Sequence, residues 1–168
     1  MYSKGDLIVY GNAGVYKVED ITTLKGVSYA EKNKEYYVLK PLFSEGVVYY
    51  PVDSDKIFTR PIISKKEVER IITLIPEIES KSIVCGSVAE LTEHYKSVFA
   101  THSCEDLVEL LMSIYQKKQL AKEQNRKLGQ IDETYLRQAE NQLYSEFAAA
   151  LGIDKSEVEE YIRTKVEN

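Results

Sequence analysis

Cysteine and histidine are frequent zinc ligands, and this chain holds them at four positions: Cys85, His94, His102 and Cys104. Their spacing matches none of the common zinc patterns. The hydrophobic periodicity around His94 predicts a helix, where this histidine is expected to lie on the surface or to pack inside. We therefore predict that the protein has no metal site.

Sequence patterns typical of enzymes are also missing. The chain contains no glycine-rich phosphate-binding loop and no Gly-x-Ser-x-Gly nucleophile elbow. Acidic pairs such as Glu159 and Glu160 are most simply solvated helix faces. We expect a non-enzymatic protein with no cofactor and no small-molecule substrate.

Tyrosine is unusually frequent: the chain has 13 tyrosines and no tryptophan. Many of them lie in predicted strands, namely Tyr10, Tyr16, Tyr36, Tyr37, Tyr49 and Tyr50. Neighbouring residues of a strand point to opposite faces, so one tyrosine of each adjacent pair is expected at the surface. Such a surface is either ordinary amphipathic strand or a protein-binding face.

A run of basic residues occupies the end of a long predicted helix: Lys117, Lys118, Lys122, Arg126 and Lys127. Lys118, Lys122 and Arg126 are spaced i, i+4, i+8, which predicts a shared helix face. Their charges either complement the helix dipole or form a strip that contacts phosphates. No aromatic residue is interleaved, so stacking on bases is not indicated.

The elements that position these residues fall into two parts. Short runs rich in β-branched and aromatic residues predict strands at 6–10, 15–21, 35–40 and 47–51, with a fifth at 56–60. Glycine-containing turns separate several of them, and a loop begins at Lys25 and Gly26. Short strands at this spacing are typical of a small antiparallel barrel.

After Pro61 the spacing of apolar residues becomes that of helices. Three serines, Ser64, Ser87 and Ser103, precede amphipathic stretches and are expected to cap helices. Pro76 predicts that the first helix ends or kinks there. Asp132 is a candidate cap for a fourth helix, and Gly152 is expected at the C-terminal end of that fourth helix. Asp154 opens a short last helix. The predicted domains are residues 1–60 and 64–168.

Charge and length restrict the class of protein further. The net charge of the 168 residues is −5, and the deficit lies in residues 64–168, which hold 14 basic and 19 acidic residues. Bulk attraction to nucleic acid or anionic lipid is therefore not expected. No apolar stretch is long enough to span a membrane, and the first residues do not resemble a secretory signal. With two cysteines only, we expect a cytoplasmic protein.

Several segments, in this order, resemble the CarD/CdnL-like transcription regulators, whose N-terminal domain is shared with the transcription-repair coupling factor. The matching segments are 4–10, 14–15, 34–39, 50–52, 60–64, 93–96, 139–140, 146–148, 151–153 and 157–158. Ala13 stands where the family has a histidine. The resemblance implies an α+β fold, with an N-terminal Tudor-like antiparallel β-barrel and a C-terminal all-α bundle.

In that family the barrel docks on the β subunit of RNA polymerase through an exposed strand edge. The resemblance places this edge around 47–52. Tyr49 stands there at a position where the family has a basic side chain. The implied polymerase-binding residues are Thr22, Thr23, Lys25, Val48, Tyr49, Tyr50 and Pro51.

The family's helical domain contacts promoter DNA with a tryptophan wedge and basic residues, which modulates the stability of the open complex. This chain has no tryptophan, and Leu91 falls near the wedge position. The expected basic cluster before Tyr95 is absent, and Lys96 remains as a matched DNA-facing residue. The candidate DNA-binding residues are Leu91, Lys96, Lys118, Lys122 and Arg126.

Two functions thus follow from the sequence. One is a transcription regulator that binds polymerase and contacts promoter DNA. The alternative is an adaptor that docks on polymerase through the barrel and uses its acidic helical domain to bind another protein.

Overall fold

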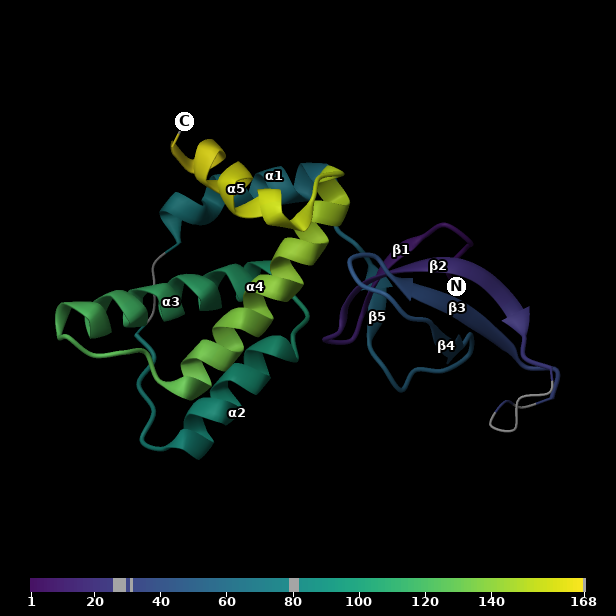
Figure 1. Cartoon of the computed structure of the whole chain (residues 1–168), viewed down its shortest axis with the longest axis horizontal. Helices are drawn as coiled ribbons and strands as arrows, with labels where there is room; N and C mark the ends of the chain where they lie inside the picture. Colours follow the sequence, from purple (N-terminus) through teal and green to yellow (C-terminus); the bar gives the residue numbers. More distant parts are fainter. Residues whose placement is uncertain (26–29, 31, 79–81, 168) are drawn as a thin grey trace.

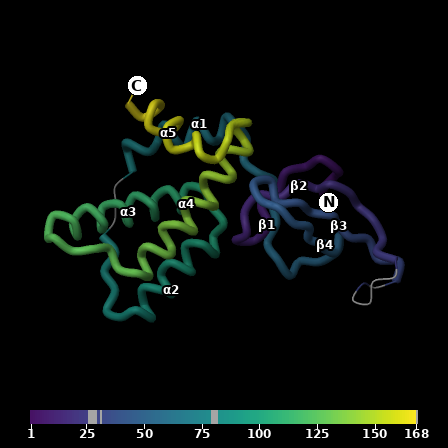
Figure 2. Tube along the Cα trace, in the orientation of Figure 1, coloured from purple at the N-terminus to yellow at the C-terminus, as the bar shows by residue number. Residues whose placement is uncertain are grey.

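The computed structural model describes residues 1–25, 30, 32–78 and 82–167. Figure 1 shows a sheet and a group of helices side by side along the longest axis, and Figure 2 traces the single crossing between them. The strands are β1 (Leu7–Tyr10), β2 (Gly14–Thr23), β3 (Glu35–Pro41), β4 (Val48–Pro51) and β5 (Thr59–Pro61). They are followed by α1 (Lys65–Leu74), η1 (Ile75–Glu77), α2 (Val88–Phe99), α3 (Cys104–Glu123), α4 (Gln130–Leu151), η2 (Lys155–Glu157) and α5 (Val158–Glu167).

The five strands form an antiparallel sheet in the order β4-β3-β2-β1-β5. The predicted succession of strands and then helices is confirmed; the predicted small barrel is wrong in that the sheet does not close. β4 and β5 are the two edges, and no ladder joins them among the described residues. A register shift between Val18 and Asp20 bends β2, which curls the sheet without closing it. Gly26, expected in the loop after Lys25, lies outside the described residues.

One face of the sheet carries a small apolar core. Its fully packed members are Ile8, Val18, Tyr37, Leu39 and Tyr50. The surface prediction for adjacent tyrosines is confirmed for Tyr49 and Tyr50, because Tyr49 is exposed and Tyr50 is buried. It is wrong for Tyr36 and Tyr37, because both are buried; the opposite face of β3 is also covered at Tyr36.

The helices enclose a second, larger core around Tyr95, Ile114 and Phe147. The expected caps are confirmed at Ser64, Ser87 and Ser103, since each side chain accepts a hydrogen bond from the backbone N–H three residues on. Helix α1 ends before Pro76, and Gly152 ends α4 with φ of 69°, which few residues other than glycine adopt.

The predicted cap at Asp132 is wrong. Helix α4 begins earlier, with Gly129 as its N-cap, and Asp132 is buried in the first turn. There its carboxylate accepts hydrogen bonds from the Tyr95 hydroxyl and, at 3.0 Å, from the Lys117 ammonium. Asp132 therefore joins α2, α3 and α4 through buried polar contacts instead of capping a helix.

Replacing Phe147 by alanine tests the helical core. Phe147 is fully buried, so Phe147→Ala leaves a cavity and should lower the free energy of unfolding by about 3–5 kcal/mol in urea denaturation. Val166→Ala on exposed α5 should change it by less than about 0.5 kcal/mol. Equal stabilities of the two variants would contradict this description of the core.

Candidate protein-binding edge of the sheet

The edge strand β4 has backbone groups that no neighbouring strand pairs. The Val52 N–H donates to the Glu35 carbonyl of β3 at 3.1 Å, and Tyr50 lies opposite Tyr37. Because the backbone groups of successive strand residues point to alternate sides, those of Tyr49 point away from β3. No helix of the described chain packs along this edge (Figure 1). The Tyr49 N–H and C=O are therefore available to another strand.

Apolar side chains surround these backbone groups. Leu42, Phe43 and Val47, in the connection between β3 and β4, are exposed, and so is Tyr49 at 42%. The same connection contains the single charge of Glu45. An exposed apolar patch beside an unpaired strand is a typical protein-binding surface.

Tyr50 holds this edge in place from inside the sheet. Its hydroxyl accepts a hydrogen bond from the Ile57 N–H at 3.0 Å and lies 3.2 Å from the carbonyl oxygens of Ser54 and Ile57. These contacts tie the connection between β4 and β5 to the sheet. Tyr50 is thus a supporting residue of the edge, and its own side chain is only 7% exposed.

The other expected docking residues lie at one end of the sheet. Thr22 and Pro51 flank Tyr36 on its two sides, because Tyr36 pairs with Thr22 of β2 and with Pro51 of β4. Thr23 follows at the end of β2, and Lys25 is exposed in the turn beyond it. Val48 packs partly against the sheet core. The structure brings Thr22 and Thr23 near the end of β4, but β3 separates them from the edge itself.

A protein-family model described as the CarD-like/TRCF RID domain matches residues 2–63. This segment contains the whole sheet. Residues 2–63 form a CarD-like/TRCF RID domain. RID domains bind the β subunit of RNA polymerase, so the edge described above belongs to a polymerase-interacting domain. No curated protein matches the chain.

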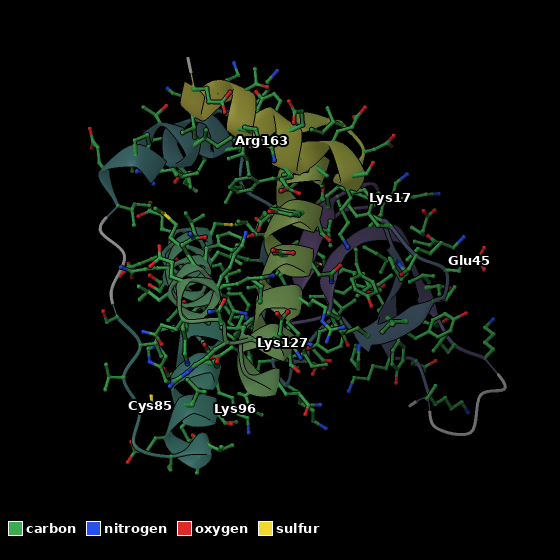
Figure 3. All side chains as sticks on the ribbon, turned by 60° about the vertical axis from the view of Figure 1, so that its left-hand side comes forward. Lys17, Glu45, Cys85, Lys96, Lys127 and Arg163 are labelled. Carbon is green, nitrogen blue, oxygen red and sulfur yellow. The ribbon has the colours of Figure 1, made fainter. Side chains whose placement is uncertain are left out.

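The residues expected to bind DNA lie outside the RID domain and do not gather at one place. Leu91 is half-buried and packs against the helical core. Two valines that the sequence reasoning missed, Val84 and Val88, are the strongly exposed apolar side chains at this end of α2. Lys96 is exposed farther along α2, and Figure 3 shows it away from the sheet.

The basic run does not share one helix face. Lys118 and Lys122 lie on α3, but the helix ends at Glu123, and Arg126 lies in the following loop. Lys118 also pairs with Glu133 of α4 at 3.8 Å. Three exposed cations, Lys122, Arg126 and Lys127, make no ion pair with any described residue, and we call these three the basic tip. In Figure 1 this end of α3 lies opposite the sheet.

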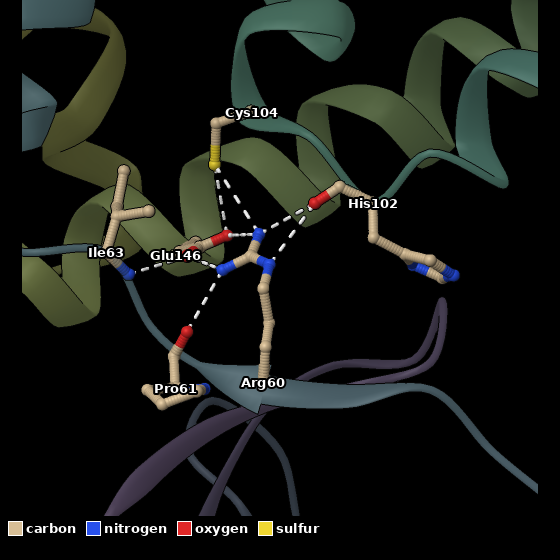
Figure 4. A network of polar contacts seen from close by, with 6 residues as sticks. All are labelled: Arg60, Pro61, Ile63, His102, Cys104 and Glu146. Atoms are coloured by element: carbon tan, nitrogen blue, oxygen red, sulfur yellow. Dashed lines mark hydrogen bonds and ion pairs between the residues drawn. The ribbon is translucent and has the colours of Figure 1, made fainter. Parts of the chain in front are cut away.

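The RID domain is joined to the helices by an ion pair that the sequence did not reveal (Figure 4). Arg60 of β5 donates through both terminal nitrogens to the two carboxylate oxygens of Glu146 in α4, at 2.6 and 2.8 Å. It also donates to the His102 carbonyl, which lies between α2 and α3, at 3.0 and 3.2 Å. We call the Arg60–Glu146 pair the clamp.

Glu146 is only 4% exposed, and its carboxylate is fully used. Besides Arg60, it accepts from the Ile63 N–H at 2.9 Å and from the Cys104 thiol at 3.1 Å. Burial lowers the pKa of Arg60, but hydrogen bonds and charge from Glu146 outweigh that effect and leave this pKa above its ordinary value. Burial, followed by the charge of Glu146, raises the pKa of the Cys104 thiol.

Two negative findings concern the part of the chain that the structure describes. In it, no three cysteine, histidine or acidic side chains come together in a way that could hold a metal ion. None of the helices there is both long and apolar enough to cross a membrane.

Removing one hydroxyl tests the support of the edge. Tyr50→Phe should lower the free energy of unfolding by about 1–2 kcal/mol, because it leaves backbone groups around Ile57 without their partner. Faster hydrogen exchange at the Ile57 amide, measured by NMR, should accompany the loss. The matched control is Tyr16→Phe, since the Tyr16 hydroxyl makes no hydrogen bond with a described residue; an equal loss in both variants would contradict the role of Tyr50.

Proposed function

We propose that this protein is a non-enzymatic, cytoplasmic transcription regulator that docks on the β subunit of RNA polymerase through β4. The observation that carries the proposal is the unpaired backbone of Tyr49 on an open edge of a RID domain. A strand of the polymerase would extend the sheet there, with backbone hydrogen bonds giving affinity.

The side chains around Tyr49 would give this docking its specificity. Tyr49 brings a large exposed surface to the centre of the edge, and Leu42, Phe43 and Val47 extend it along the connection from β3. Aromatic side chains are frequent centres of binding energy because they bury much area at low entropic cost. Pro51 has no N–H, which limits how far a partner strand can pair along β4.

A second part of the proposal concerns promoter DNA. The basic tip is exposed and lacks ion-pair partners among the described residues, so its cations are available to phosphates. Such contacts would position the protein on DNA and would modulate the stability of the open complex. The tip has no aromatic residue to insert between bases, so the contact would not read sequence.

The adaptor function remains the second candidate. The observation that favours it is the charge of residues 64–168, where 19 acidic residues outnumber 14 basic ones. A protein partner of the helices would then replace the DNA contact, while docking through β4 would be unchanged.

Binding of purified β subunit tests the docking edge. Tyr49→Ala should weaken binding at least ten-fold in biolayer interferometry, because it removes the central exposed side chain. Tyr49→Pro should weaken it similarly, because it removes an N–H that points outward and leaves the bonds to β3 intact. The matched control is Tyr115→Ala on α3, since Tyr115 is 41% exposed, almost equal to Tyr49.

Wild-type affinity in both Tyr49 variants would show that β4 is not the docking edge. If the wild-type protein itself does not bind the β subunit, polymerase docking is wrong.

Neutralising the basic tip tests the DNA contact. The triple variant Lys122→Gln, Arg126→Gln, Lys127→Gln should weaken association with a polymerase–promoter complex. It should also reduce the salt dependence, with the slope of log affinity against log salt falling by about 2–3, because three phosphate contacts disappear. Fluorescence anisotropy of labelled promoter over a salt series measures both effects.

The matched control neutralises three exposed lysines of α1 and α5: Lys65, Lys66 and Lys165. It changes the net charge equally and should leave the slope unchanged. Identical slopes in the wild type and both variants, together with intact binding to the β subunit, would favour the adaptor.

A further inference from the structure

The RID domain and the helices touch through a small set of described contacts. Besides the clamp, the rings of Phe58 and His102 stack with their centroids 4.0 Å apart. The Gln142 side chain of α4 donates to the Asn12 carbonyl at 2.9 Å. These contacts come from β5, from α4 and from three connections, namely β1 to β2, β4 to β5 and α2 to α3, and α4 also packs against β2.

The clamp has a geometry that resists rotation. A guanidinium that donates both terminal N–H groups to one carboxylate has a fixed plane and direction. The same guanidinium also holds the His102 carbonyl, and the same carboxylate holds the Ile63 N–H. Five segments of the chain thus meet at two side chains: β5, the connection from β5 to α1, the connection from α2 to α3, the start of α3, and α4.

The clamp also uses the opposite edge of the sheet from the docking edge. Arg60 lies on β5, whereas β4 is at the other end of the strand order. The helices are therefore held through β5 and through the packing of α4 on β2, and β4 stays open. A partner that binds β4 would receive the helices in an orientation that the clamp determines.

We propose that Arg60 and Glu146 are positioning residues, which fix the helical domain relative to β4 so that docking places the helices at one defined site on the polymerase. This inference rests on the proposed docking through β4. It does not depend on whether the helices then contact DNA or another protein.

The reactivity of Cys104 reports whether the clamp is intact. Its thiol donates to Glu146, lies 3.8 Å from a terminal nitrogen of Arg60, and is 5% exposed. Separation of the sheet from the helices would expose it to a thiol reagent. Cys85 is half-buried in the connection before α2 and makes no hydrogen bond with the clamp, so it serves as an internal reference for the reagent.

The first measurement is the rate of alkylation by iodoacetamide, followed at each cysteine by mass spectrometry. Glu146→Gln keeps the shape of the side chain and removes its charge, and it should raise the rate at Cys104 at least ten-fold, through exposure together with a lower pKa of the thiol. Arg60→Lys, a second variant, keeps both charges and loses the two-pronged contact, so a higher rate in this variant reports the exposure of Cys104. Rates at Cys85 should change by less than two-fold.

The second measurement is lysine cross-linking of each protein in complex with RNA polymerase. In the wild type, lysines of the sheet, such as Lys17 and Lys40, and lysines of the helices, such as Lys96 and Lys127, should each form a reproducible set of cross-links. In the clamp variants the sheet cross-links should persist, while those from the helices should fall at least five-fold or spread over many sites.

The matched control is Glu140→Gln. Glu140 is another hydrogen-bonded carboxylate of α4, but it contacts Tyr115 of α3 and not the sheet. This variant should behave as the wild type in both measurements, which separates the clamp from a general effect of removing a charge from α4.

An unchanged rate at Cys104 in both clamp variants would overturn the proposal. So would helix cross-links that stay at their wild-type sites while Cys104 is exposed. These outcomes differ from a failure of the proposed function, in which even the sheet lysines of the wild-type protein form no cross-links to the polymerase.

Discussion

The arrangement of this protein depends on one buried carboxylate. Glu146 lies in the wall of the helical core, where an unpaired negative charge would be strongly unfavourable. The guanidinium that compensates it comes from the last strand of the RID domain, 86 residues earlier in the chain. Because neither charge can be buried alone at low cost, the helices and the sheet meet where Arg60 and Glu146 meet.

The same side of the sheet receives the helices. Arg60 on β5 binds α4, and α4 also packs against β2, whereas none of the described helices packs along β4. The sheet does not close on itself, and side chains replace the missing ladder. The Tyr50 hydroxyl holds the connection to β5, and the Tyr2 hydroxyl donates to Thr59 of β5 at 3.0 Å. An open edge is therefore compatible with an ordered domain.

The two candidate binding surfaces are far apart and differ in character. The edge around Tyr49 is apolar and uses backbone groups, whereas the basic tip is charged and follows α3 at the other end of the molecule. Since the first surface is apolar and the second is charged, salt should weaken binding at the basic tip more than binding at the edge. Among the described residues, the clamp, the Phe58–His102 stack, the Gln142–Asn12 hydrogen bond and the packing of α4 on β2 set their mutual orientation.

Patterns within a few residues predicted much of this protein. The change from alternating to helical periodicity near Pro61, the serine caps and the stop at Gly152 are all local, because each depends on hydrogen bonds or side chains close in the chain. The edge at 47–52 was also reached from the sequence, through its likeness to a family. The shared face of Lys118, Lys122 and Arg126 was wrong because it assumed that the helix continues past Glu123.

Other features were decided by the tertiary structure alone. The open sheet, the burial of both Tyr36 and Tyr37, the place of Asp132 and the clamp depend on residues that are distant in the chain. Arg60 is one of 22 basic residues and Glu146 one of 27 acidic ones, and neither stands out by its neighbours. Which charges pair in a buried site depends on which surfaces pack together, and that is settled only when the whole chain has folded.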